Sequence, residues 1–292
     1  MDLFLQQTLS GLATGGIYAG LALAVVMIYQ ATDHFNFAQG EMAMFSTYVA
    51  WQLVTWGTPY WIAFVLTIAI SFLAGAALER VVIRPFEKAP ILNQVIVFIG
   101  LLVIFNATAG TIWEFTIKAV PSPFGEAPPF GNTYIGAHEA GTIVVTLIVL
   151  ALVYAFFRFT SVGLAMRAAA QNPESASLCG ISVGAMLALG WGLAASIGAV
   201  SGIMIAPKVF LEPNMMIGVL LYGFAGALLG GVGSPTGAVI GGFMMGVIEN
   251  LVGTYVPYFG SELKLSLALI LIVAVLMFRP NGLFGQTVVK RV

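Results

Sequence analysis

The sequence predicts an all-α membrane protein, a polytopic transmembrane helical bundle of eight to nine spans with broken or re-entrant helices. Of the 292 residues, 60% are hydrophobic and 8% are charged, and the mean hydropathy is +1.00. Soluble domains are about one quarter charged. The apolar runs are long and continuous, as in 143–157 and 265–278, whereas a membrane β-barrel would show alternating segments of about ten residues.

Nine segments have the character of a helix that crosses a bilayer, which needs about 20 apolar residues. They are 8–29, 41–56, 60–79, 92–113, 141–158, 186–206, 217–231, 236–256 and 263–279. Within 8–56 and within 217–256 the two segments are only loosely separated, so each region could instead hold a broken or re-entrant helix. We expect a single transmembrane domain over 1–292. The first ten residues carry Asp2 and no Lys or Arg, so we expect the first helix to be retained rather than cleaved.

The basic residues predict the orientation. Under the nine-span count, eight of the eleven Lys and Arg residues fall on one side, namely Arg80, Arg84, Lys88, Arg158, Arg167, Arg279, Lys290 and Arg291. The remaining three, Lys118, Lys208 and Lys264, fall on the other side. Because cytoplasmic loops are enriched in Lys and Arg, we expect a multi-pass protein of the cell (inner) membrane. Its N-terminus would lie outside, and its C-terminus and the central loop 158–185 would lie in the cytoplasm.

Two regions share one plan. Residues 8–56 contain an apolar helix, the break DHFNFAQGEM (33–42) and a second helix; residues 217–256 contain an apolar helix, the break LGGVGSPTGAV (229–239) and a second helix. Broken helices at matching places in duplicated halves indicate a transport site. Gly-rich turns also recur by chance in membrane proteins, and both interpretations stay open.

Polar and small residues at the two breaks are candidates for a substrate pathway: Asn36, Gln39, Gly40, Glu41, Gly231, Gly233 and Ser234. A buried carboxylate in a bilayer must be paired or hydrated, although Glu41 could equally be a first-turn residue stabilised by the helix dipole. Glu249 could simply reach the interface by snorkelling or have a transport role, and Glu79 with Arg80 is most simply a helix-end anchor. A break in lipid needs protein or water to satisfy its backbone.

The polar central loop contains signals for two short helices. The residues NPE (172–174) are typical of a helix start, with Asn as the cap, Pro at the first position and Glu in the first turn, and Gly180 is typical of a stop. We therefore expect a helix over 173–179.

A second short helix is expected over 164–171, and its face contains Leu164, Ala165 and Ala168. Two such helices cannot form a core of their own, so they must rest on the membrane helices or on another protein. A helix that lies on lipid headgroups would show a larger basic face than Arg167 alone. Docking onto a partner is the better interpretation.

Ordered motifs then carry a family resemblance: GGIYA (15–19), NFAQGEM (36–42), ERVVIRP (79–85), TSVGLAMRAAAQNPESASLCGI (160–181), LGGVGSPTGAVIGG (229–242) and RPNGLFG (279–285). Together, and over nearly the whole chain, they resemble the permease subunit of the branched-chain amino acid ABC importers. The sequence departs from the family at position 39, where this chain has Gln39 and a histidine is common in the family.

The resemblance implies an importer that moves branched-chain or other hydrophobic amino acids into the cell. Its other parts would be a second permease that is related but not identical, two cytoplasmic ATPase subunits and an extracytoplasmic solute-binding protein. The central loop would be the coupling segment, and the residues expected to contact the ATPase are Arg167, Gln171, Asn172, Glu174 and Ser175. No cofactor is implied.

The sequence itself agrees that this chain is not an ATPase. It contains no G-x-x-x-x-G-K-[ST] loop, so it cannot bind ATP by that means; if transport is driven by ATP, another chain must supply the energy. The net charge of −1 provides no basic surface for nucleic acid.

Other functions stay open. The same type of importer could carry urea, short amides or aromatic acids. A stand-alone secondary transporter or channel would be favoured by chains of intramembrane Asp, Glu and His, of which the sequence has few. A membrane-embedded enzyme would need clustered metal ligands or nucleophiles, whereas His34, His138 and Cys179 fall on separate loops.

Overall fold

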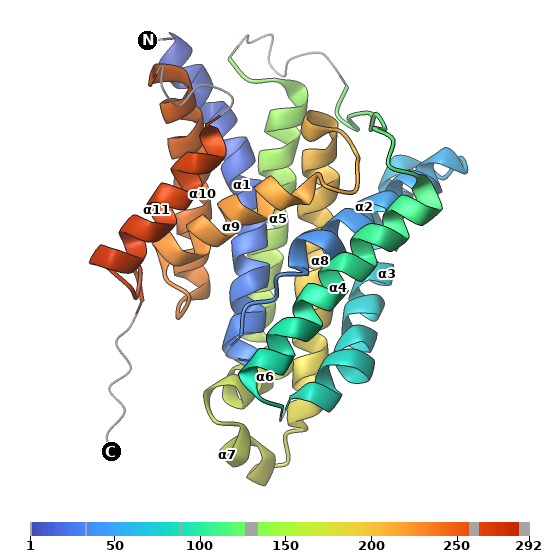
Figure 1. The fold of residues 1–292 in the computed structure, drawn as a ribbon, viewed down its shortest axis with the longest axis vertical. Coiled ribbons are helices and arrows are strands. Elements are labelled where there is room, and N and C mark those ends of the chain that lie inside the picture. Colours follow the sequence, from blue (N-terminus) through green and yellow to red (C-terminus); the bar gives the residue numbers. More distant parts are fainter. Residues whose placement is uncertain (1, 33, 88, 126–133, 257–262, 286–292) are drawn as a thin grey trace. The chain divides into compact units, whose positions relative to one another are not determined.

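The computed structural model describes residues 2–32, 34–87, 89–125, 134–256 and 263–285 (Figure 1). Within these ranges the elements are helices, and the only β-type pairing is an isolated bridge between Lys118 and Leu211. The helices are α1 (Asp2–Thr32), α2 (Gln39–Thr55), α3 (Tyr60–Leu78), η1 (Glu79–Ile83), η2 (Arg84–Phe86), α4 (Ile91–Trp113), α5 (Ala137–Phe159), α6 (Ser161–Gln171), α7 (Pro173–Leu178), α8 (Val183–Val209), α9 (Met216–Gly230), α10 (Pro235–Tyr255) and α11 (Lys264–Phe278).

The all-helical membrane class is confirmed. In the described part of the chain, six helices are long and apolar enough to cross a membrane: α1, α3 with its extension to Phe86, α4, α5, α8 and α10. The predicted spans at 41–56, 217–231 and 263–279 coincide with α2, α9 and α11, which have 17, 15 and 15 residues. Because the 15 residues of α9 and α11 fall short of a full crossing and the 17 residues of α2 lie at its lower limit, the count of eight to nine spans stays a prediction.

The chain forms two compact units, which are described separately. The first comprises Met1–Val26, Ser122–Val144 and Ile217–Val292, and the second comprises Met27–Pro121 and Val145–Met216. The long helices α1 and α5 each contribute residues to both units. The first unit therefore contains most of α1 with α9, α10 and α11, and the second contains α2, α3, α4, α6, α7 and α8.

Close approach of backbones holds the first unit together. A side chain at Gly246 of α10 would collide with the backbone of Gly15 on α1, and one at Gly242 would collide with the backbone of Ala19. Small residues let membrane helices pack at such short range, where dispersion contacts and backbone proximity replace the hydrophobic effect. The apolar composition of α1 and α10 thus includes a seam of small residues that fixes their packing.

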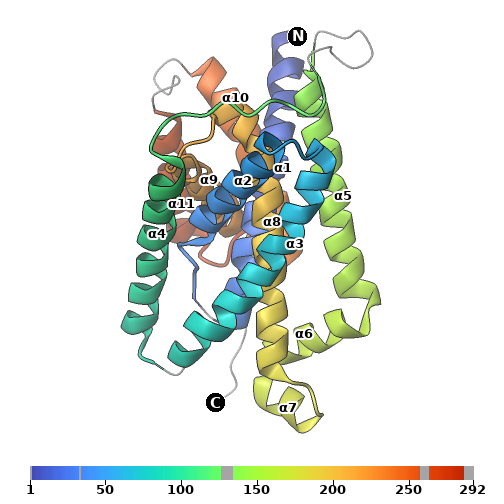
Figure 2. The same ribbon diagram turned by 90° about the vertical axis from the view of Figure 1, so that its right-hand side faces the viewer.

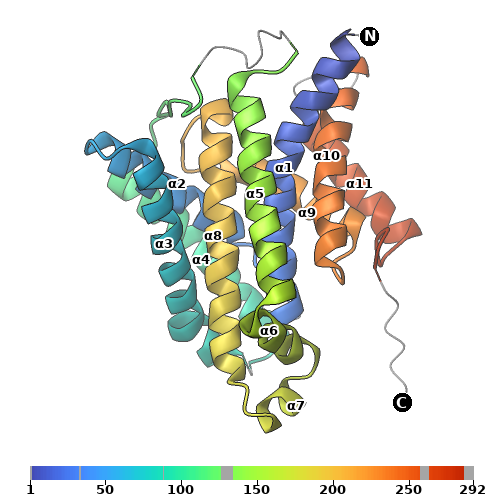
Figure 3. The same cartoon turned by 180° about the vertical axis from the view of Figure 1, so that it is seen from behind.

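In the second unit, α3 runs alongside α8, and α2 packs against both (Figures 2 and 3). A Cβ at Gly75 of α3 would stand 2.6 Å from the carbonyl oxygen of Trp191, and one at Gly192 of α8 would stand 2.9 Å from the ring of Phe72. The side chain of Trp191 is fully buried. Each helix therefore presents a glycine to the other, Gly75 against the backbone of α8 and Gly192 against Phe72, and the contact is closely packed.

Candidate coupling surface and solute-pathway residues

The loop between α5 and α8 folds into α6, which lies beside the first turns of α8, and α7, which lies beyond the start of α8 (Figure 3). The hydroxyl oxygen of Thr160 accepts a hydrogen bond from the Gly163 N–H at 3.0 Å and caps α6. Oδ1 of Asn172 accepts one from the Ser175 N–H at 2.9 Å and caps α7. Side-chain caps of this kind satisfy N–H groups that have no partner inside the helix. Both predicted helices are confirmed, and α6 begins three residues earlier than expected because Thr160 is its cap.

The end of α7 is also as predicted. Gly180 has a φ of +82°, the left-handed conformation that ends many helices. Its N–H donates to the carbonyl of Ser177 at 3.0 Å, and the N–H of Ile181 donates to the carbonyl of Ala176 at 3.0 Å. Both ends of the short helix are therefore defined by local hydrogen bonds.

The face of α6 that is buried differs from the expected one. Gly163, Met166 and Ala169 are buried, whereas Leu164 is 60% exposed. A side chain at Gly163 would collide with the carbonyl oxygen of Phe156 on α5, and α6 packs against α8. Gly163, Met166 and Ala169, spaced three residues apart, therefore form the face of α6 that packs on the membrane helices. Leu164 lies on the exposed face.

The outer surface of the two helices combines polar and apolar side chains. The five predicted contact residues, Arg167, Gln171, Asn172, Glu174 and Ser175, are all exposed. Among the apolar neighbours, Leu178 is 90% exposed and Phe159 is 77% exposed. The short helices therefore leave both polar and apolar side chains uncovered. We call residues 159–178 the coupling surface, after the role that the sequence predicts for them.

The first polar break lies in the second unit, before and within the first turn of α2. Asn36 and Gln39 are fully buried, Glu41 is 2% exposed, and Gly40 is buried. Oδ1 of Asn36 accepts a hydrogen bond from the Ala38 N–H at 3.0 Å, so this side chain shapes the turn that leads into α2.

Gln39 joins α2 to α8. Its Nε2 donates to the carbonyl oxygen of Ala194 at 2.9 Å, and a Cβ at Gly198 would stand 2.7 Å from that nitrogen. Its Oε1 is buried and has no hydrogen-bond partner in the described part of the chain. A buried acceptor without a partner is costly, which makes Gln39 a good candidate for contact with a solute or water.

Glu41 lies beside a polar group that the sequence analysis missed. Nδ2 of Asn106, on α4, stands 3.4 Å from Oε2 of Glu41 and donates to the carbonyl of Pro213 at 2.9 Å and to Oδ1 of Asn214 at 3.1 Å. Three acceptors from α2 and from the segment before α9 thus converge on one amide nitrogen. Asn106 is a polar residue inside the apolar run 92–113, a signal that could have identified it, whereas nothing in the sequence points to Asn214.

The second polar break lies in the first unit, between α9 and α10. Oγ of Ser234 accepts a hydrogen bond from the Gly237 N–H at 3.1 Å and caps α10. Gly231 has a φ of +108°, and a Cβ there would stand 2.6 Å from the carbonyl oxygen of Asn281. Among the described atoms, apart from its chain neighbours, nothing lies within 4 Å of the Cβ position of Gly233. The helix is broken here, as predicted. Ser234 has a structural role as the cap of α10, and Gly231 is needed for its positive φ and its close contact with Asn281.

The segment that follows α11 completes this break. The N–H of Leu283 donates to the carbonyl of Leu229 at 2.9 Å, and the N–H of Phe284 donates to the carbonyl of Gly230 at 3.0 Å. Carbonyl groups at the end of a helix have no partner inside the helix. The motif RPNGLFG therefore supplies, from protein rather than water, the hydrogen bonds that the end of α9 needs.

Glu249 does not reach out to the interface. It is 8% exposed, and its Oε2 accepts a hydrogen bond from the hydroxyl of Tyr18 at 2.7 Å. The ring of Tyr18 stacks on that of Tyr222, with 5.0 Å between the centroids. The snorkelling interpretation is wrong because a tyrosine on α1 offers the carboxylate a buried donor.

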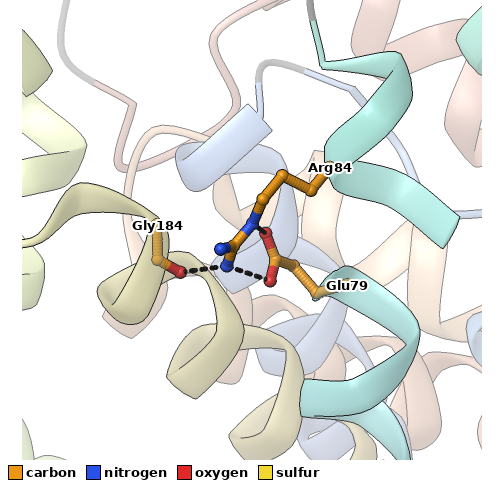
Figure 4. Close-up of polar contacts among 3 residues, drawn as sticks. All are labelled: Glu79, Arg84 and Gly184. Atoms are coloured by element: carbon orange, nitrogen blue, oxygen red, sulfur yellow. Dashed lines mark hydrogen bonds and ion pairs between the residues drawn. The ribbon is translucent and has the colours of Figure 1, made fainter. Parts of the chain in front are cut away.

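Glu79 lies at the end of α3, as expected, but its partner is Arg84 and its side chain is buried. It is 2% exposed and forms an ion pair with Arg84, whose Nη2 lies 2.6 Å from Oε2 of Glu79 (Figure 4). Nε of Arg84 donates to Oε1 of the same carboxylate at 3.1 Å, and Nη2 also donates to the carbonyl oxygen of Gly184 at 2.7 Å. The contact joins the end of α3 to the first turn of α8.

Long apolar helices interrupted by polar breaks, with a short two-helix surface between them, define a multi-pass helical membrane protein. The family model described as "Branched-chain amino acid transport system / permease component" matches residues 7–278. The chain belongs to this family.

Named relatives agree along the full length. The high-affinity branched-chain amino acid transport system permease protein LivH of Escherichia coli (strain K12) is 30% identical over 312 aligned residues, which cover 99% of this chain and 98% of the relative. The permease protein BraD of Pseudomonas aeruginosa is 30% identical over 305, with the same coverage. The probable LivH of Methanocaldococcus jannaschii is 27% identical over 282, which cover 91% and 87%. The family consists of transport permeases, not enzymes.

Proposed function

We propose that this chain is the transmembrane permease subunit of an ATP-binding-cassette importer. It moves branched-chain or other hydrophobic amino acids into the cell, and separate ATPase subunits supply the energy. The single observation that carries the proposal is the coupling surface. In a chain that is 8% charged, two capped helices rest on α8 by one face and expose their polar residues on the other.

The proposed arrangement is one transmembrane domain over 1–292 that contains the cytoplasmic coupling loop 158–185. Helices lie at all nine predicted positions, which supports eight to nine spans in which 8–56 and 217–256 either cross twice or re-enter. The C-terminus lies in the cytoplasm, on the same side as the coupling loop. Lys88, Lys290 and Arg291, which enter the charge argument, lie outside the described residues.

The proposed partners are two ATPase subunits, a second permease that is related but not identical, and an extracytoplasmic solute-binding protein. Arg167, Gln171, Asn172, Glu174 and Ser175 form the contact with the ATPase. Their exposure supports this assignment. A guanidinium and a carboxylate on one small surface allow charge-assisted hydrogen bonds to a complementary partner.

The proposed solute pathway is made of the residues at the two breaks. Asn36, Gln39, Gly40 and Glu41 contribute at the start of α2, and the partnerless oxygen of Gln39 supports this choice. Gly231, Gly233 and Ser234 contribute at the start of α10, where the open space beside Gly233 supports a role. An amino acid carries an ammonium and a carboxylate, so it needs both acceptors and donors from such broken-helix ends.

Reconstitution tests the proposed function. The chain is incorporated into proteoliposomes with its cognate ATPases, second permease and binding protein, and uptake of radiolabelled leucine, urea and benzoate is compared. We expect leucine uptake that requires both ATP and the ATPase subunits. Leucine uptake by the permeases alone would overturn the proposal in favour of a secondary transporter, and ATP-dependent uptake of urea or benzoate in place of leucine would replace the solute.

A further inference from the structure

The contact between Glu79, Arg84 and Gly184 depends on an unusual stretch of backbone. Glu79–Ile83 is a π-helical segment, followed by the 3₁₀ turn Arg84–Phe86. In an α-helix, residues five apart point about 140° away from each other. A π-turn bonds residues five apart and brings their side chains to the same side. The π segment therefore allows the guanidinium of Arg84 to bind both carboxylate oxygens of Glu79 (Figure 4).

The acceptor on α8 fits the guanidinium closely. Gly184 lies in the first turn of α8, and a Cβ at this position would stand 3.2 Å from Cζ of Arg84. A carbonyl oxygen can accept a second hydrogen bond beside the one from its own helix. One arginine thus connects the end of α3 to the start of α8, with a buried carboxylate as its counter-charge.

Arg84 is attached to α8 close to the coupling surface. Helix α8 begins five residues after α7 ends, and both α6 and α7 contact it. Helix α3 packs along α8 through Gly75 and Gly192. A displacement of the coupling surface would therefore reach the start of α8 first, which is the point where Arg84 is attached.

We propose that Arg84 is a positioning residue that transmits movement of the coupling surface from α8 to α3. The inference rests on the proposed function, since it concerns how ATP hydrolysis elsewhere becomes a helix movement here. With the bridge intact, α3 and α8 move as one body. Without the Arg84 contact, the start of α8 moves with the coupling surface but the end of α3 does not. ATP hydrolysis then continues, whereas solute transport is lost.

A purely stabilising ion pair is the competing interpretation, and variants separate the two. Arg84→Lys keeps the charge, but one ammonium cannot reproduce the fork that binds two carboxylate oxygens and a carbonyl. The double variant Glu79→Leu with Arg84→Met removes the pair without leaving a buried charge, a replacement that often preserves stability. Arg80→Lys, at an exposed position of the same π segment, is the matched control.

The measurement is solute taken up per ATP hydrolysed in the reconstituted complex, with thermal stability recorded for each variant. We expect Arg84→Lys and the double variant to assemble with the ATPases and hydrolyse ATP, and their uptake per ATP to fall roughly tenfold, within the usual range of coupling free energies. We expect Arg80→Lys to match the wild type. Wild-type uptake per ATP in the double variant would overturn the inference, whereas a wild-type complex without ATP-dependent uptake would overturn the proposed function instead.

Discussion

The hydroxyl of Tyr18 on α1 donates a 2.7 Å hydrogen bond to the buried carboxylate of Glu249 on α10. The two residues are separated by 231 positions in the sequence. We expect Tyr18→Phe to lower the free energy of unfolding by about 1–3 kcal/mol, because a buried carboxyl group loses a hydrogen bond. Thermal unfolding of the purified permease in detergent measures the change. Tyr255→Phe, at a half-exposed position of α10, is the control, and equal stability of the two variants would contradict the role of Tyr18.

A second prediction concerns the close packing of Gly246 on α10 against Gly15 on α1. Gly246→Ala would force a methyl group into the backbone of Gly15, so we expect loss of stability and a reduced yield of folded protein. The control is Gly100→Ala on α4, where no described atom outside the neighbouring turns of the same helix lies within 4 Å of the added Cβ. That substitution should be neutral or stabilise by up to about 1 kcal/mol, since alanine is the better helix former. Size-exclusion profiles and thermal unfolding distinguish the two, and a well-folded, stable Gly246→Ala protein would exclude close packing at this position.

The polar cluster around Asn106 predicts an effect on solute handling rather than on coupling. We expect Glu41→Gln and Asn106→Ala to raise the KM for leucine uptake by about tenfold, equivalent to roughly 1.4 kcal/mol of binding free energy. Uptake per ATP should stay at the wild-type value. Asn93→Ala, at an exposed position of α4, should leave KM unchanged. Wild-type KM in both cluster variants would remove Glu41 and Asn106 from the pathway.

Charge reversal tests the coupling surface. Arg167→Glu should weaken the association with the ATPase subunits and reduce solute-stimulated ATP hydrolysis, because a proposed cationic contact becomes anionic. Co-purification of the ATPase and its hydrolysis rate are the two readouts. Ser177→Ala, at an exposed position of the coupling surface that is not one of the five proposed contact residues, should behave as the wild type. Undiminished co-purification of Arg167→Glu would place the ATPase contact elsewhere.

Asn172 has a structural role that must be separated from recognition. Asn172→Asp retains an oxygen that can accept from the Ser175 N–H, whereas Asn172→Ala removes the cap at a cost of about 1 kcal/mol. If Asn172 acts only as a cap, Asn172→Asp supports wild-type uptake. Hydrogen exchange of the α7 amides checks the cap directly, and faster exchange in the alanine variant alone is the expected result.

The local features of the fold could be predicted from the sequence because they depend on groups a few residues apart. The cap at Asn172 and the stop at Gly180 are of this kind, and both are confirmed. Such features carry their own signal, since the side chain or glycine that makes them is adjacent to the helix end that it shapes.

The long-range contacts could not be predicted in the same way. The partner of Glu249 is Tyr18 on α1, and the neighbour of Glu41 is Asn106 on α4. The hydrophobic periodicity of a helix does not specify which residue of another helix it will contact. The pairing of Glu79 with Arg84 could not be predicted either, because it depends on a π segment that changes the direction of the side chains that follow it. The number of crossings also stays open, because the 17 residues of α2 lie at the lower limit for a membrane span.

The hydrogen bonds from Leu283 and Phe284 to the end of α9 have a consequence for biosynthesis. The carbonyl groups of Leu229 and Gly230 are synthesised some fifty residues before the N–H groups that bind them. Until then, water or the insertion machinery must provide their hydrogen bonds. The turn between α9 and α10 therefore reaches its final form only after α11 has emerged. Nascent chains arrested shortly before Leu283 would hold that turn in an immature state.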